Sequence, residues 1–366
     1  MKHTFIFLFL LLPLWGVSQA SKILIVVSGY GKDAGKVRPG YEFDEFSQAY
    51  LMFTTNGFEV EVASPKGGRV EAGELNKSKP YNQQVLANEA AMQLLQNTKP
   101  TASLNAADYA AVYIVGGKGA MFDLPFDPSL QELIATMYLK NSVVAAVCHG
   151  PAALVNVQLN DGKYLIADKT VAGFCNEEEQ MFGKKWKGEF PFLLEDKLKS
   201  RGAIYQKTDP MLPQVSIAGK LITGQNPYST VALTEEIVKA LGKQPVARKP
   251  YADEMSMNLV KRAIAGEWAW AKDELAQHKA SYDLELIAVY GYYRSTFAKD
   301  DKKTTRLALD IMELATPHYY NPNLQLAQAM CYKNLDDKAA AKRLLEDLVK
   351  KEPQLEEAKK RLAELP

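Results

Sequence analysis

Two patterns of apolar and polar residues alternate between residues 22 and 241. Short apolar runs rich in Val and Ile predict strands, and stretches with apolar residues every three to four positions predict amphipathic helices. The strands are expected at 23–27, 58–63, 109–115, 143–147, 169–172 and 221–223. The helices are expected at 43–56, 84–96, 129–140, 190–201 and 229–241, with Ser129 as an N-cap. Because several strands are continuous apolar runs, helices should cover both faces of a mostly parallel sheet.

This alternation predicts a doubly wound, flavodoxin-like α/β domain over residues 21–242. In such domains ligands bind at the carboxyl ends of the strands. Gly116, Gly117 and Cys148 all fall at strand ends, so the candidate chemistry lies at one edge of the sheet.

A different pattern begins after residue 242. Residues 243–250 contain two prolines and three basic residues and are expected to form a linker. Residues 251–366 are rich in Ala, Leu, Lys and Glu and predict an all-α domain. Ala308, Ile311, Met312 and Glu313 recur 33 positions later as Ala341, Leu344, Leu345 and Glu346. This period is typical of helical repeats of tetratricopeptide type, and an irregular bundle is the alternative.

Residues 1–20 have the pattern of a secretory signal peptide. A short polar start precedes an apolar run at 5–12, and Ser18 and Ala20 supply small residues for cleavage. The run is too short to span a membrane, so we expect cleavage near Ser21 and a periplasmic or secreted protein. A retained N-terminal anchor is the alternative. No stable membrane span is expected elsewhere in the chain.

Charge and residue counts exclude several classes of protein. The 366 residues leave room for two domains, and 44 basic residues balance 43 acidic ones. Nucleic acid and anionic membranes are therefore not expected as partners. The three cysteines do not form a disulfide framework, and no Cys or His pattern has metal-ligand spacing. We expect no metal site.

The strand at 143–147 runs directly into Cys148, His149 and Gly150. Small residues around a nucleophile allow a sharp strand-to-helix turn that lifts its side chain from the sheet edge. A thiol at a helix N-terminus is expected to have a lowered pKa, which favours the thiolate. A buried structural cysteine is the alternative. After signal removal His149 is the one histidine of the α/β domain, so it is the imidazole available to Cys148.

Four motifs follow one another in the α/β domain. They are Gly-Tyr-Glu-Phe-Asp-Glu at 40–45, continued by 56–68; Gly-Gly-Lys-Gly-Ala-Met-Phe-Asp-Leu-Pro at 116–125; Ala-Val-Cys-His-Gly-Pro-Ala-Ala-Leu at 146–154; and Ala-Gly-Phe-Cys-Asn-Glu-Glu-Glu at 172–179. Together they resemble the ThiJ/PfpI superfamily, and within it the glyoxalase III-like, heat-shock-chaperone branch. The resemblance covers residues 22–241 and omits the helical tail. It implies a class I glutamine amidotransferase-like fold, no cofactor and, as in many members, a homodimer.

The resemblance also implies two carboxyl groups in the site. Glu45 would hydrogen-bond the nucleophile, and we expect it to be protonated because a second anion beside a thiolate raises both pKa values. Glu179 would orient the histidine, with Glu178 as the second choice; an acidic helix start is the alternative reading of both. Glu42 and Asp44 are expected to be exposed on their helix.

Glycines complete the expected site. Gly116 and Gly117 resemble the family's oxyanion loop, where backbone N–H groups approach a developing charge, and Gly150 follows the elbow. Lys118 stands where the family usually has His, and it would add positive charge near the thiolate or point to solvent. Cys175 stands where the family usually has Thr, as a small structural residue or as a resolving thiol for oxidised Cys148.

The function implied is that of a cofactor-independent glyoxalase (D-lactate dehydratase), which converts methylglyoxal and similar 2-oxoaldehydes to 2-hydroxy acids. Cys148 would form a hemithioacetal and His149 would move the proton. A deglycase acting on glycated substrates and a cysteine amidase or peptidase could use the same residues. A stress chaperone or scaffold that binds protein partners through residues 251–366 is the alternative of another class. A glutamine amidotransferase proper is disfavoured because its distant histidine is missing.

Overall fold

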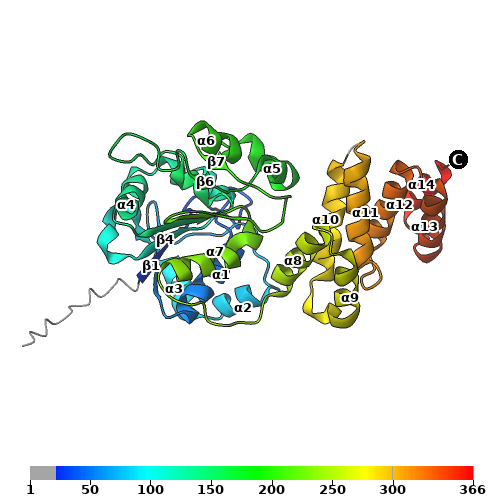
Figure 1. Cartoon of the computed structure of the whole chain (residues 1–366), viewed down its shortest axis with the longest axis horizontal. Coiled ribbons are helices and arrows are strands. Elements are labelled where there is room, and N and C mark those ends of the chain that lie inside the picture. The colour runs from blue at the N-terminus through cyan, green and yellow to red at the C-terminus, as the bar shows by residue number, and fades with distance from the viewer. Residues whose placement is uncertain (1–21, 299, 366) are drawn as a thin grey trace, which may run out of the picture.

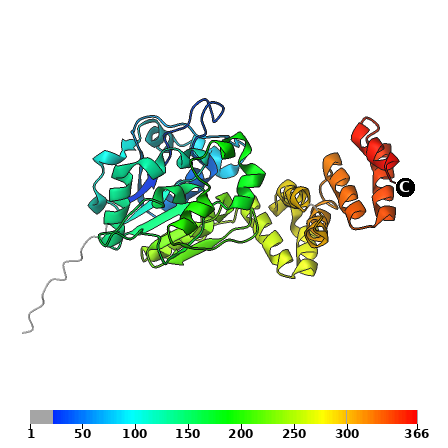
Figure 2. The same ribbon diagram turned by 90° about the horizontal axis from the view of Figure 1, so that it is seen from above.

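The computed structural model describes residues 22–298 and 300–365. The predicted signal peptide lies outside the described residues. An α/β domain and an all-α domain follow each other along the chain, and both views show the helical domain extending from one end of the α/β domain (Figures 1 and 2). None of the described helices is both long and apolar enough to cross a membrane.

The α/β domain is built on a seven-stranded sheet of order β3-β2-β1-β4-β5-β9-β8. Its strands are β1 (Lys22–Val26), β2 (Glu59–Ser64), β3 (Lys99–Pro100), β4 (Ala111–Ile114), β5 (Val143–Val147), β8 (Val215–Ala218) and β9 (Leu221–Gly224). All neighbours are parallel except β8 and β9. The predicted doubly wound, mostly parallel sheet is confirmed. Chain order reverses at β1 and β4, next to β5, which is where such sheets bind ligands.

Helices cover both faces of the sheet (Figure 1). One face carries α1 (Phe43–Thr55), α2 (Pro80–Leu86), α3 (Glu89–Gln96) and α7 (Thr230–Ala240); the other carries α4 (Pro128–Leu139), α5 (Asn176–Phe182) and α6 (Leu194–Ser200). Every residue of β4 and β5 is buried as a result. This explains the uninterrupted apolar runs of these strands, since a strand covered on both faces has no solvent side.

Three elements differ from those predicted, and local polar residues account for the first two differences. The helix expected at 84–96 is divided into α2 and α3 because the side chain of Asn88 caps α3 at the backbone N–H of Ala91. Asp127, not Ser129, caps α4. The strand expected at 169–172 is shorter, β6 (Thr170–Val171), and pairs with β7 (Ile204–Tyr205) in a separate two-stranded sheet.

The helical domain consists of α8 (Ala252–Ile264), α9 (Trp268–His278), α10 (Leu284–Phe297), α11 (Lys302–Ala315), α12 (Pro322–Asn334), α13 (Lys338–Lys351) and α14 (Glu356–Ala363). Buried residues recur at equivalent places in three helices: Ala271 and Leu275 in α9, Thr305 and Leu309 in α11, Ala341 and Leu345 in α13. Ala308 and Met312 of α11 are buried with the same spacing. The assignment to the tetratricopeptide type stays a prediction.

Polar contacts attach the helical domain to the α/β domain. In the segment 243–250 the backbone N–H of Val246 donates to Oδ1 of Asn56 (2.8 Å). At the start of α8, Asp253 accepts a hydrogen bond from the Tyr81 hydroxyl (2.8 Å) and pairs with Lys79 (3.2 Å). The two domains are thus joined by buried and half-buried polar groups as well as by the chain.

A loop of the α/β domain also enters the core of the helical domain. Met211 and Leu212 are buried in one apolar cluster with Met257 and Val260 of α8 and Ile287 of α10. Because burial of apolar surface drives association, this cluster holds the helical domain against the loop that precedes β8. The docking surface lies beside the carboxyl end of the sheet.

Candidate active site

Cys148 lies at a sharp turn directly after β5. Its φ of 59° is in the left-handed region, which is strained for a residue with a side chain. The chain then enters a 3₁₀ helix at Gly150–Leu154. A Cβ atom on Gly150 would collide with the carbonyl oxygen of Ile114, and one on Gly116 would lie 2.7 Å from the backbone nitrogen of His149. The turn therefore needs the small residues that the sequence supplies.

His149 connects Cys148 to Glu179. The Sγ atom of Cys148 lies 3.3 Å from Nδ1 of His149, and Nε2 of His149 lies 2.5 Å from Oε1 of Glu179. All three side chains are buried. Glu179 comes from α5, and Gly183, one turn later, leaves room for its carboxylate, because a Cβ atom there would lie 2.9 Å from Oε2. The structure brings the predicted nucleophile, base and orienting carboxylate into one chain of contacts.

Glu45 reaches the same turn from α1. Its Oε2 atom accepts a hydrogen bond from the backbone N–H of Gly116 (2.6 Å), and its side chain is fully buried. Burial raises the pKa of the Glu45 carboxyl well above its usual range, and the nearby carboxyl of Glu42 raises it further. A protonated Glu45 is the state that this environment favours.

The pKa of the Cys148 thiol is raised by its burial, opposite to the direction expected from a helix N-terminus. A charged Glu45 would raise it further, whereas the backbone N–H of Gly117 lowers it. Protonation of Glu45 removes the repulsion between the two groups. This environment favours the neutral thiol, and His149, in contact with Sγ, is the group that can accept its proton.

The backbone N–H groups of the two glycines after β4 have different partners. The N–H of Gly116 already donates to Glu45 and does not face the cavity, so Gly116 does not take the oxyanion role predicted for it. Gly117 lines the cavity, and its N–H points to the Cys148 thiol. The N–H of His149 has no acceptor among the described residues. The residue after the nucleophile usually supplies the second oxyanion donor.

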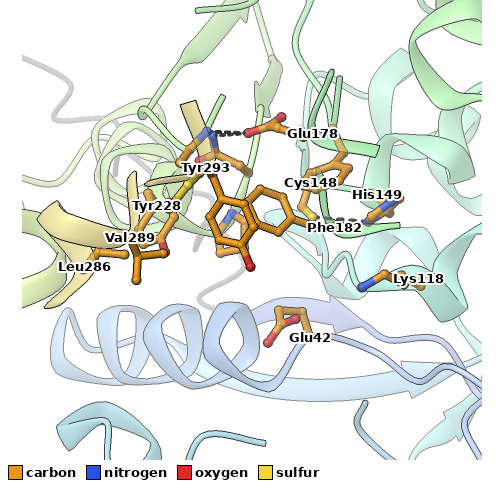
Figure 3. A pocket seen from close by; sticks show the side chains of 15 residues that line it. Glu42, Lys118, Cys148, His149, Glu178, Phe182, Tyr228, Leu286, Val289 and Tyr293 are labelled. Atoms are coloured by element: carbon orange, nitrogen blue, oxygen red, sulfur yellow. Dashed lines mark hydrogen bonds between the residues drawn. The ribbon is translucent and has the colours of Figure 1, made fainter. Parts of the chain in front are cut away.

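A cavity of about 250 Å³ opens beside Cys148 (Figure 3). Its polar lining residues are Glu42, Lys118, Cys148, His149, Glu178 and Asn226, and its larger apolar and aromatic ones are Phe174, Phe182, Met211, Tyr228, Leu286, Val289 and Tyr293. The last three belong to α10 of the helical domain. Three more predicted site residues do not line the cavity. They support the Cys148 turn and the His149 ring from the side away from it: Gly150, Glu45 and Glu179.

Glu42 and Asp44 are not exposed on their helix, and that expectation was wrong. Glu42 lines the cavity, and its pKa is raised to about 8 by burial and by the charge of Asp44, while Lys118 lowers it. Asp44 accepts hydrogen bonds from the side chains of Tyr81 (3.0 Å) and Asn82 (2.5 Å). The spacing of Glu42 and Glu45 could have indicated that Glu42 faces the site, since residues three apart share a helix face.

Glu178 and Cys175 belong to a neighbouring structural network. Glu178 accepts hydrogen bonds from the backbone N–H of Met211 (2.9 Å) and from the side chain of Asn226 (2.9 Å). The Cys175 thiol faces the side-chain amide of Gln225 and does not line the cavity. Burial raises the pKa of this thiol. These contacts fit a structural Cys175, and the alternative of a resolving thiol stays a prediction.

One group of described side chains has the spacing to hold a metal ion: Cys175, Glu177 and Glu195. Lys207 already pairs with Glu177 (2.5 Å), and Lys199 with Glu195 (2.5 Å). Both carboxylates are therefore neutralised by lysines, and the group lies outside the cavity beside Cys148.

A doubly wound sheet with a Cys-His-Glu chain of contacts at a strand-to-helix elbow defines the cysteine members of the class I glutamine amidotransferase-like fold. A profile of the DJ-1/PfpI family matches residues 21–240. The chain belongs to this family. The helical domain lies beyond the matched region.

Relatives with known names match the α/β part of the chain over nearly their whole length. The glutathione-independent glyoxalase hsp3102 of Schizosaccharomyces pombe is 30% identical over 62% of this chain and 99% of its own. Glyoxalase 3 of Candida albicans is 30% identical over 60% and 98%. Among solved structures, glyoxalase III from Candida albicans superposes with a TM-score of 0.56 at 26% identity, covering 61% of this chain and 98% of its own. The Rapid Encystment Protein 24 KDa of Francisella tularensis superposes with a TM-score of 0.57 at 30% identity, with 60% and 98% covered.

Proposed function

We propose that this protein is a cofactor-independent glyoxalase of the glyoxalase III type, which converts a 2-oxoaldehyde and water to a 2-hydroxy acid. The observation that carries the proposal is the contact chain from Sγ of Cys148 through His149 to Glu179, set at the wall of a cavity. The names of the relatives support the same reaction.

The first step forms a hemithioacetal. His149 takes the proton of the Cys148 thiol at Nδ1, and the carboxylate of Glu179 stabilises the imidazolium through Nε2. The thiolate adds to the aldehyde carbon, and the carbonyl oxygen gains the negative charge. The backbone N–H groups of Gly117 and His149 would donate to that oxygen. This oxygen then takes the proton from the His149 imidazolium, which completes the hemithioacetal and leaves His149 neutral for the next step.

The second step moves hydrogen between the two carbons of the substrate. His149 removes the proton from the former aldehyde carbon and returns a proton to the neighbouring carbon through an enediol. This produces a thioester on Cys148. Water hydrolyses the thioester, which releases the 2-hydroxy acid and restores the thiol. Water is the only co-reactant, and the substrate undergoes no net oxidation.

The test measures D-lactate formed from methylglyoxal. Cys148→Ser removes the thiolate and is expected to abolish product formation. Cys331→Ser is the matched control, because Cys331 is a buried free thiol in α12, outside the cavity. A wild-type protein that forms no lactate, or a Cys148→Ser variant that forms it at the wild-type rate, would contradict the proposal.

Export is a separate proposal, supported by the signal-peptide pattern of residues 1–20 alone. Sequencing the N-terminus of the mature protein tests it. A mature chain that begins near Ser21 supports cleavage, and one that keeps residues 1–20 contradicts it.

A protein partner for residues 251–366 is likewise a proposal. The recurrence of buried positions in α9, α11 and α13 supports a repeat of tetratricopeptide type, a class that binds proteins on an extended face. A chaperone role through this region predicts that suppression of client aggregation survives Cys148→Ser. Loss of that suppression in Cys148→Ser would assign it to the catalytic site instead.

A homodimer, also expected from the resemblance, would be measured by light scattering.

A further inference from the structure

The outer wall of the catalytic cavity is made by the helical domain. Leu286, Val289 and Tyr293 all line the cavity, and their spacing places them on one face of α10. Figure 3 shows Leu286 and Val289 on the side of the cavity opposite His149 and Lys118. Since the family profile ends at residue 240, this wall is an addition of this chain to the family's domain.

The wall is held in a defined position. The ring of Tyr293 packs edge-to-face on Phe182 of α5, with the ring centroids 4.9 Å apart. The next residue of α10, Arg294, lies 3.5 Å from Asp209, in the loop that carries Met211 into the helical core. A wall fixed by packing and by an ion pair has a definite shape, which is what selection between substrates requires.

The cavity changes character from one end to the other. The reacting groups and the ionisable side chains of Glu42 and Lys118 lie away from α10, and the surface supplied by α10 is apolar or aromatic. Its volume of about 250 Å³ would hold roughly eight water molecules at the density of the liquid. Methylglyoxal, whose substituent is a single methyl group, would leave much of this apolar space unfilled.

We propose that Leu286, Val289 and Tyr293 are specificity-determining residues, and that the preferred substrates are 2-oxoaldehydes with an apolar substituent much larger than methyl, such as an aryl group. The two carbonyl groups lie at Cys148, and the substituent packs against α10. This inference rests on the proposed glyoxalase function and names its substrate class. Burying the larger substituent removes apolar surface from water in the bound state.

The experiment compares phenylglyoxal with methylglyoxal by kcat/KM for hydroxy-acid formation. The wild-type protein is expected to favour phenylglyoxal by roughly tenfold or more, the effect that apolar groups have in such pockets. Val289→Phe fills the space and should lower kcat/KM for phenylglyoxal roughly tenfold more than kcat/KM for methylglyoxal. Leu286→Phe is a second variant with the same expected result.

Val349→Phe is the matched control, because Val349 is a half-buried valine of α13 that does not line the cavity. It should leave the ratio of the two kcat/KM values unchanged. A wild type without preference for phenylglyoxal, or filling variants that reduce both aldehydes equally, would overturn this inference and leave the glyoxalase function standing. A wild type that converts neither aldehyde would overturn both.

Discussion

The Nε2 atom of His149 lies 2.5 Å from Oε1 of Glu179, with both side chains almost completely buried. This contact leaves Nδ1 facing the Cys148 thiol, 3.3 Å away. The pair thus determines which ring nitrogen can take the thiol proton. Because burial raises the pKa of the thiol, formation of the nucleophile depends on this histidine and its carboxylate.

Replacement of Glu179 tests that dependence. Glu179→Gln keeps the shape but removes the charge that stabilises the imidazolium, and we expect kcat/KM to fall roughly 10²- to 10⁴-fold. Glu177→Gln, two residues earlier and half-exposed, is the control and should have little effect. The measurement is the rate of hydroxy-acid formation. Equal effects of the two variants would contradict the orienting role.

The space behind Glu179 can be tested with a methyl group. Gly183 has a φ of −61°, so alanine adds no backbone strain there, but its Cβ would lie 2.5 Å from the backbone carbonyl oxygen of Glu179 and 2.9 Å from its carboxylate oxygen Oε2. Gly183→Ala is expected to lower kcat by roughly tenfold or more through misplacement of Glu179. A Cβ atom on Gly188 meets nothing within 4 Å, so Gly188→Ala is the control. If Gly183→Ala retains full activity, the position of Glu179 is not critical.

Alanine substitutions at two glycines with positive φ can distinguish the cost of backbone strain from the cost of a steric collision. Gly117 (φ 85°) and Gly162 (φ 78°) both have a positive φ, and the ψ of 154° at Gly117 places it in a region that is essentially restricted to glycine. Gly162→Ala should cost only the strain, about 1 kcal/mol of unfolding free energy, because its Cβ meets nothing within 4 Å. Gly117→Ala should cost more, since its Cβ collides with the backbone of Glu42, and it should also lose activity. Urea unfolding measures both; equal losses would contradict the close approach.

The raised pKa of Glu42 predicts a pH dependence of stability. The folded protein keeps the proton of Glu42 up to a pH of about 8, whereas the unfolded chain loses it near the ordinary glutamate pKa of 4.5. The folded state therefore binds more protons between these values, and the free energy of unfolding contributed by Glu42 is full below pH 4.5 and falls as the pH rises toward 8. Glu42→Gln should flatten that decline in urea unfolding measured from pH 5 to pH 8.

The control for this prediction is Glu132→Gln, at an exposed position of α4. It should leave the pH dependence as in the wild type. An unchanged slope in Glu42→Gln would show that Glu42 is ionised in the folded protein throughout this range.

Local patterns in the sequence were sufficient for the sheet and the elbow. The apolar run 143–147 coincides with β5, and the small residues around Cys148 predicted the turn, because a buried strand and a tight turn each impose their requirement on adjacent residues. The scarcity of histidine pointed to His149. Glu45 and Glu179 could be named only through the resemblance to a family, since their contacts join distant segments.

Only the tertiary structure decided the hydrogen-bond partners in the site, the direction of the pKa shift of Cys148 and the position of α10. Whether Gly116 donates to Glu45 or to a substrate, and whether the pKa of Cys148 rises or falls, depends on burial by elements far apart in the chain. The place of α10 depends on how two folded surfaces fit together. No spacing in the sequence relates Val289 to Cys148, because complementarity between surfaces is a property of the assembled fold and not of any local pattern of residues.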